Sequence, residues 1–328
     1  MMFQIIIFSV ISFLVTLIML PKFIRYLTKI NLVVKDQNKE NLPLIPISGG
    51  MAVLAGISAS LLLTVFLETF YNNGSQERII LIFAALSTIL IITFIGFIDD
   101  LIIKTSRESS SGLKQWQKPL LTLPATIPLI VANAGVTIIA IPFYKAIDVG
   151  LIYPLILVPI GIIGAANMVN LLAGFNGSEA GMGLVYTGML GLYAFVNNRD
   201  LAAILAFSTF AALLAFFIFN KYPSKIFPGD SLTYLLGAVI ATIAIIGNIE
   251  KAALIASTPF FIEFILKARS KFKAQSYGFF KDGKVQSKYD KIYSIPHILT
   301  RSGKYTEKQV MLFMIVIELF FSSLIWIL

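Results

Sequence analysis

The chain has 328 residues, of which 57% are hydrophobic and only 13% are charged, and its formal net charge is +9. A soluble domain carries about 25% charged residues, so this composition excludes an ordinary soluble fold, which needs a polar exterior. The lack of cysteine and the single histidine, His297, exclude disulfides, thiolate metal sites and multi-histidine metal clusters.

Ten apolar stretches predict an all-α, polytopic membrane protein with about ten transmembrane helices, forming a single domain over residues 1–328. A span needs about 20 apolar residues. The N-terminal stretch lacks the basic start and the cleavage site of a signal peptide, so we interpret it as the first span. The ten stretches lie near 3–21, 47–67, 79–98, 119–134, 151–172, 181–196, 201–219, 231–247, 251–267 and 310–328.

Lysine and arginine divide unevenly between alternate loops. With the N-terminus placed outside, 22 of the 26 fall in inside loops, and only Arg78, Lys145, Arg199 and Lys251 fall outside. Because positive residues concentrate in cytoplasmic loops, we expect both termini outside and the basic loops in the cytoplasm. The net charge then needs no nucleic-acid partner, and no basic helix or aromatic platform stands outside the membrane to bind one.

The first polar feature is the pair Asp99 and Asp100, which ends the apolar stretch FIGFIDD. Adjacent carboxylates repel each other unless a nearby cation or protonation relieves them, so the pair needs one of these two if it is buried. The alternative is a helix end that faces water. Neighbouring helical positions also point about 100° apart, so both carboxylates need not face one site.

The second feature is NMVNLLAGFNGSEAGMG, residues 167–183. Asn167 and Asn170 are three residues apart and share a helix face, and an amide inside an apolar span is costly unless it is bonded or coordinates something. Asn176-Gly177 then favours a tight turn, and small residues let a ligand approach the backbone. The alternative is hydrogen bonding between helices beside a plain turn.

Two later segments add charged and aromatic groups. Asp230 follows Pro-Gly at the start of an apolar stretch, where aspartate is a preferred N-cap, and Phe227 could stack on a base. In SIPHILTR, His297 and Arg301 can donate hydrogen bonds to phosphate or sugar oxygens, although a loop histidine and arginine alone mean little.

All four features fall on the predicted cytoplasmic face. Acids and amides suit a hard cation such as Mg²⁺, while Lys118, Lys221, Lys225 and Arg301 suit phosphates. Together they predict a metal-assisted reaction of a phosphate ester with a membrane-bound substrate.

Three motifs, FIGFIDD, NMVNLLAGFNGSEAG and YPSKIFPGD, occur in an order and spacing that resemble the polyprenyl-phosphate N-acetylhexosamine-1-phosphate transferase family, of the glycosyltransferase 4 type. The AG-x-NG form at 173–177 and the Lys118-Pro-Leu-Leu run are more similar to the eukaryotic and archaeal dolichyl-phosphate branch, because bacterial members usually carry DG-x-DG. The resemblance covers most of the chain, including a ten-span plan with outside termini.

The resemblance implies that UDP-N-acetylglucosamine (UDP-GlcNAc) donates GlcNAc-1-phosphate to a polyprenyl or dolichyl phosphate and releases UMP, as the first lipid-linked step of a glycan pathway, expected to be N-glycan. It implies Mg²⁺, which Mn²⁺ could replace. Asn170 and Asp230 would bind this metal. The implied catalytic residues are Asp99, Asp100 and Lys118. The implied substrate-binding residues are Asn176 and Phe227, which would bind uracil, Gly174, which would let the nucleoside approach, and His297 and Arg301 in the loop that reads the sugar.

The implied location is the cell membrane of a prokaryote or archaeon, or the endoplasmic reticulum of a eukaryote, with the active site facing the cytoplasm. Membrane lipids would surround the protein, and a homodimer is left open. Two alternatives also stay open. One is another UDP-N-acetylhexosamine donor, because the chain reads PHILTR where the eukaryotic branch has a denser Arg-His-Arg cluster. The other is a lipid or solute transporter, which broken helices and intramembrane polar groups also suit.

Overall fold

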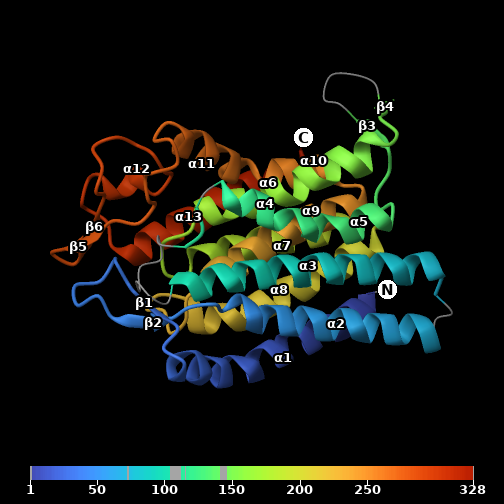
Figure 1. The fold of residues 1–328 in the computed structure, drawn as a ribbon, viewed down its shortest axis with the longest axis horizontal. Helices are drawn as coiled ribbons and strands as arrows, with labels where there is room; N and C mark the ends of the chain where they lie inside the picture. The colour runs from blue at the N-terminus through green and yellow to red at the C-terminus, as the bar shows by residue number, and fades with distance from the viewer. Residues whose placement is uncertain (1, 72–73, 104–111, 115, 141–145, 328) are drawn as a thin grey trace.

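Long helices run side by side along the long axis of the molecule (Figure 1). The structure is a computed structural model and describes residues 2–71, 74–103, 112–114, 116–140 and 146–327. The long helices are α1 (Met2–Lys29), α2 (Gly50–Phe70), α3 (Gln76–Ile103), α6 (Val158–Leu171), α7 (Ser178–Val196), α8 (Asp200–Asn220), α9 (Gly229–Gly247) and α13 (Glu307–Ser323).

Eight helices among the described residues are long and apolar enough to cross a membrane, which confirms a helical, polytopic membrane protein. The predicted stretches 119–134 and 251–267 are built differently, as runs of short helices. Proline in the first turn of a helix is tolerated, but it breaks the bonding of the helix before it; Pro124, Pro128 and Pro259 occupy such positions. The first run is α4 (Gln117–Thr122), η1 (Leu123–Thr126) and α5 (Ile127–Val131), and the second is α10 (Glu250–Ala256) and α11 (Thr258–Ala268).

Helix α9 lies at the centre of the bundle. It is buried from Ser231 to Ile245 and packs against α3, α6 and α8. A Cβ at Gly96 of α3 would lie 2.4 Å from the carbonyl oxygen of Asp230, and one at Gly237 of α9 would lie 2.3 Å from that of Ala165. Glycine at these contacts lets the backbones approach closely, as small residues do in membrane bundles.

Irregular segments and short antiparallel hairpins lie at the two ends of the bundle. Figure 1 shows β1, β2, β5, β6 and α12 (His297–Thr300) at one end and β3 and β4 at the other. The first end therefore carries the loops that the sequence predicts to be cytoplasmic. The hairpins pair β1 (Val33–Lys35) with β2 (Leu44–Pro46), β3 (Ile138–Ala140) with β4 (Ala146–Asp148), and β5 (Phe279–Lys281) with β6 (Lys284–Gln286).

Candidate active site

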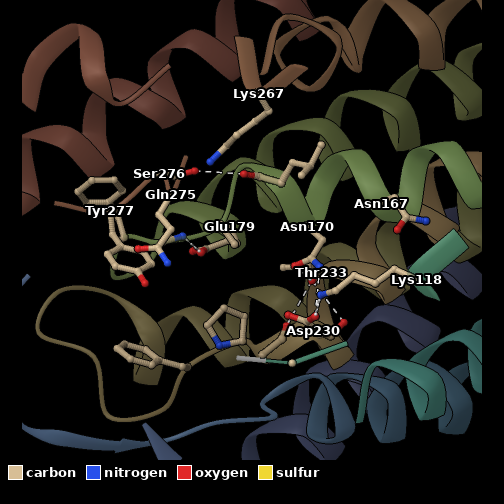
Figure 2. Close-up of a pocket in the computed structure, with 18 of the residues that line it drawn as sticks. Lys118, Asn167, Asn170, Glu179, Asp230, Thr233, Lys267, Gln275, Ser276 and Tyr277 are labelled. Atoms are coloured by element: carbon tan, nitrogen blue, oxygen red, sulfur yellow. Dashed lines mark hydrogen bonds and ion pairs between the residues drawn. The ribbon is translucent and has the colours of Figure 1, made fainter. Parts of the chain in front are cut away.

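A cavity of about 600 Å³ lies at this loop-rich end of the bundle. Its wall is formed by α4, α6, the first turn of α9, the β1–β2 connection and the segment 272–277. Figure 2 shows Lys118, Asn170 and Asp230 together on one side of it, and Glu179 and Tyr277 away from them on the other side. A cavity of this volume suits a small molecule of nucleotide size.

Lys118 is buried between two carboxylates. Its Nζ lies 2.6 Å from Asp230 Oδ2 and 2.8 Å from Asp99 Oδ2, and Asp99 also accepts a hydrogen bond of 2.6 Å from the backbone N–H of Leu113. Two negative charges at these distances stabilise the positive charge of the buried ammonium group. Lys118 is therefore a fixed positive charge on the cavity wall.

The two adjacent aspartates at the end of α3 serve different partners, although both are fully buried. Asp100 accepts hydrogen bonds from Ser48 Oγ at 2.7 Å and from the backbone N–H groups of Asp230 at 2.7 Å and Ser231 at 3.2 Å. It thereby satisfies the free donors at the start of α9. Asp99 reaches the site lysine, whereas Asp100 anchors the helix that carries Asp230.

Asn170 and Asp230 meet in the same part of the cavity. Asn170 Nδ2 donates to Asp230 Oδ2 at 3.2 Å, and Thr233 Oγ1 donates to Asn170 Oδ1 at 3.0 Å. A half-turn of the amide would direct Oδ1 toward Asp230. One carboxylate and one amide oxygen fit Mg²⁺, which typically takes one or two protein ligands and completes its shell with water and phosphate. Within the described residues there is no group of three His, Cys, Asp or Glu side chains that could enclose a metal.

The turn after α6 brings backbone to the cavity wall. Gly174 has φ of +150° and Gly177 has φ of +78°, which favour glycine. A Cβ at Gly174 would lie 3.3 Å from the Cβ of Tyr277, so a side chain there would press on the segment that faces it. The predicted tight turn and the predicted lack of side-chain bulk are both present.

Of the two residues predicted to bind uracil, Phe227 lines the cavity. Asn176 borders it too, but its side chain is committed elsewhere and is 2% exposed. Its Oδ1 accepts from the Ser224 N–H at 2.7 Å, and its Nδ2 donates to Asp36 Oδ2 at 3.1 Å and to Glu307 Oε1 at 2.6 Å. Contact between this amide and uracil would require one of these bonds to be exchanged.

The structure does not bring His297 and Arg301 to the cavity. His297 is fully buried in the loop: its Nε2 donates to the carbonyl of Gln275 at 3.0 Å, and its Nδ1 accepts from the Tyr293 N–H at 3.3 Å. Burial lowers the pKa of His297 to about 4, so it is neutral near pH 7. Arg301 is exposed, and neither residue lines the cavity. His297 supports the wall through Gln275.

The sequence did not lead us to predict that the segment 272–277 forms part of the cavity wall. Lys273, Gln275, Ser276 and Tyr277 all line the cavity, and Ser276 Oγ donates to the carbonyl of Leu171 at 3.1 Å, which fastens the segment to the end of α6. The only signal in the sequence is a mixture of basic, aromatic and amide residues, KFKAQSYG, in a long basic loop.

Comparison with known proteins agrees with these features. The family model described as glycosyl transferase family 4 matches residues 82–248. A protein of Saccharolobus solfataricus, which bears the provisional name UDP-N-acetylglucosamine–dolichyl-phosphate N-acetylglucosaminephosphotransferase, is 35% identical over 95% of this chain and 92% of its own. A protein of Sulfolobus acidocaldarius with the same provisional name is 34% identical over 96% and 93%. The phospho-N-acetylmuramoyl-pentapeptide-transferase of Halalkalibacterium halodurans is 31% identical over 77% and 78%.

Proposed function

The chain belongs to glycosyl transferase family 4, and on this premise we propose that it transfers GlcNAc-1-phosphate from UDP-GlcNAc to dolichyl or another polyprenyl phosphate and releases UMP. The two archaeal relatives, whose names state this activity, match nearly the whole chain. The muramoyl-pentapeptide transferase matches less of it. The reaction would be the first lipid-linked step in building a glycan.

The observation that carries the proposal is the convergence of Lys118, Asn170 and Asp230 on one cavity. A fixed cation beside oxygen ligands suits the diphosphate of a nucleotide sugar. The apolar side chains of Ile163 and Phe264 line the same cavity and suit the hydrocarbon next to a lipid phosphate. Both substrates can therefore meet at this end of the bundle.

The proposed topology has ten spans, with both termini outside and the cavity open to the cytoplasm of a cell membrane. The eight long apolar helices supply most of the spans, and the runs α4–η1–α5 and α10–α11 would supply the other two. The concentration of 22 of the 26 lysine and arginine residues in alternate loops supports this orientation.

The reaction requires an oxygen of the lipid phosphate to attack the phosphorus joined to the sugar, with UMP as the leaving group, so catalysis consists mainly of positioning and charge stabilisation. Lys118 would bind diphosphate oxygens. Asn170 and Asp230 would hold Mg²⁺, which when bound neutralises phosphate charge. Asp99 would orient Lys118 through their ion pair. The lipid phosphate, with a second pKa of about 6, is largely ionised at neutral pH, so Asp99 need not remove a proton.

The test is a reaction of purified full-length protein in lipid bilayers with Mg²⁺, labelled UDP-GlcNAc and polyprenyl phosphate. We expect a labelled, lipid-extractable product and an equal amount of UMP. Unlabelled UDP-GlcNAc should suppress the labelling, whereas UDP-N-acetylgalactosamine at the same concentration should not. If folded protein gave no product, the enzyme assignment would fail and the transporter alternative would be favoured. If UDP-N-acetylgalactosamine suppressed the labelling, the proposal of UDP-GlcNAc as the specific donor would be wrong.

Metal removal provides a second prediction. Excess EDTA should lower the rate of product formation by about 100-fold or more. Without the metal, Lys118 alone would balance the negative charge of the diphosphate. Added Mg²⁺ should restore the rate, and Mn²⁺ should restore part of it. EDTA already saturated with Mg²⁺ serves as the control. A rate that EDTA leaves unchanged would contradict the metal proposal.

A further inference from the structure

Glu307, the first residue of α13, is a buried carboxylate that the proposed mechanism does not use. It is 4% exposed and does not line the cavity. Its Oε1 accepts from Asn176 N–H at 2.9 Å, Asn176 Nδ2 at 2.6 Å and Asn38 Nδ2 at 3.4 Å, and its Oε2 pairs with Lys39 Nζ. Because a buried charge is costly unless it is paired and hydrogen-bonded, these contacts explain how the carboxylate is kept there.

The donors come from connections that form the cavity wall. Asn38 lies between β1 and β2, and Asn176 lies between α6 and α7; both border the cavity. Asn38 also donates to the Gly174 carbonyl at 2.9 Å and accepts from the Gly278 N–H at 3.2 Å. Three irregular segments therefore meet at Glu307, Asn38 and Asn176. Outside helices and strands, side-chain bonds of this kind satisfy and fix the backbone.

The same contacts extend to the aromatic side chain that can stack on a base. Asn176 Oδ1 accepts from the Ser224 N–H, and Ser224 belongs to the α8–α9 connection that also carries Phe227, a residue of the cavity wall. Figure 2 shows Glu179, which is bonded to the Gly174 N–H, and Tyr277 on the side away from Lys118 and Asp230. With the diphosphate at Lys118 and Asp230, the base would lie between Gly174 and Phe227.

We propose that Glu307 is a positioning residue for the nucleoside half of the sugar nucleotide. It holds the 174–176 turn and the loop around Asn38 at the separation that the base and ribose require. This inference rests on the proposed function, and it assigns to α13 a role in nucleotide affinity without contact with the nucleotide.

Thr306 offers a matched comparison, because it stabilises the same helix end by a different contact. Its Oγ1 accepts from the Gln309 N–H at 3.3 Å, and Gln309 Oε1 accepts from the Thr306 N–H at 2.9 Å. This capping box involves neither Asn38 nor Asn176. If Glu307 only stabilised the start of α13, Thr306→Ala and Glu307→Ala would have the same kind of effect.

The experiment compares Glu307→Ala, Glu307→Gln and Thr306→Ala in the full-length protein. It measures kcat, both KM values, the Kd of UMP by calorimetry, and Tm. Glu307→Ala should raise the KM of UDP-GlcNAc and the Kd of UMP by about tenfold or more, because hydrogen bonds to a charged group are lost. The KM of the lipid should stay within about twofold. Glu307→Gln, which keeps one acceptor oxygen, should fall between wild type and Glu307→Ala. Thr306→Ala should lower Tm alone.

An unchanged UMP Kd in Glu307→Ala, or an equal rise in Thr306→Ala, would overturn the inference. If Glu307→Ala does not fold, Glu307→Gln and Asn38→Ala decide the matter, and wild-type UMP affinity in both would count against it. Failure of the proposed function would appear separately, as wild-type protein that binds UMP but forms no lipid product.

Discussion

Asp230→Ala should lower the rate of lipid product formation by about 100-fold or more. Asp230 Oδ2 contacts both Lys118 Nζ at 2.6 Å and Asn170 Nδ2 at 3.2 Å, so its removal takes away the proposed carboxylate ligand of Mg²⁺ and one partner of the site lysine. The measurement is kcat at saturating substrates, together with the Mg²⁺ concentration that gives half-maximal rate. Asp230→Asn, which keeps the shape but not the charge, should need more Mg²⁺.

The control for this prediction is Asp290→Asn, an exposed carboxyl of the same loop-rich end that does not line the cavity. Its rate and Mg²⁺ dependence should match wild type. Near-normal turnover in Asp230→Ala would refute the metal role of Asp230. A fall in rate with unchanged Mg²⁺ dependence in Asp230→Asn would instead assign Asp230 to the placement of Lys118.

Lys118→Met should lower kcat by about 10²–10³-fold, the loss typical of removing a charge-stabilising donor from an active site. Methionine keeps an unbranched apolar stem of nearly the same length but lacks the ammonium group. Two effects combine, since the diphosphate loses its fixed cation and the carboxylates of Asp99 and Asp230 lose the charge that lies between them. Single-turnover rates at saturating Mg²⁺ would measure the loss.

Lys114→Met is the matched control, because Lys114 lies four residues earlier in the same segment and is exposed. It should retain the wild-type rate. A kcat within about threefold of wild type in Lys118→Met would exclude Lys118 from transition-state stabilisation. A similar loss in both variants would point to a general effect of positive charge at this end of the molecule.

The sequence determined the class of structure and pointed to residues of the candidate site. Long apolar runs must be helices in a membrane, because every backbone donor and acceptor needs a partner there, and eight such helices are present among the described residues. Polar groups within or beside those runs, together with the family resemblance, pointed to Lys118, Asn170 and Asp230, and these three meet in one cavity. Such residues stand out in sequence because polar groups are rare and costly in apolar spans.

Only the tertiary structure decided which partner each polar group serves. Asp99 and Asp100 are indistinguishable in the motif, yet one pairs with Lys118 and the other anchors α9. His297 reads as a ligand-binding residue in sequence, but it is buried against Gln275. The physical reason is that hydrogen bonds and ion pairs depend on contacts between segments far apart in the chain. Asn176 and Glu307, 131 positions apart, show that local patterns do not record such contacts.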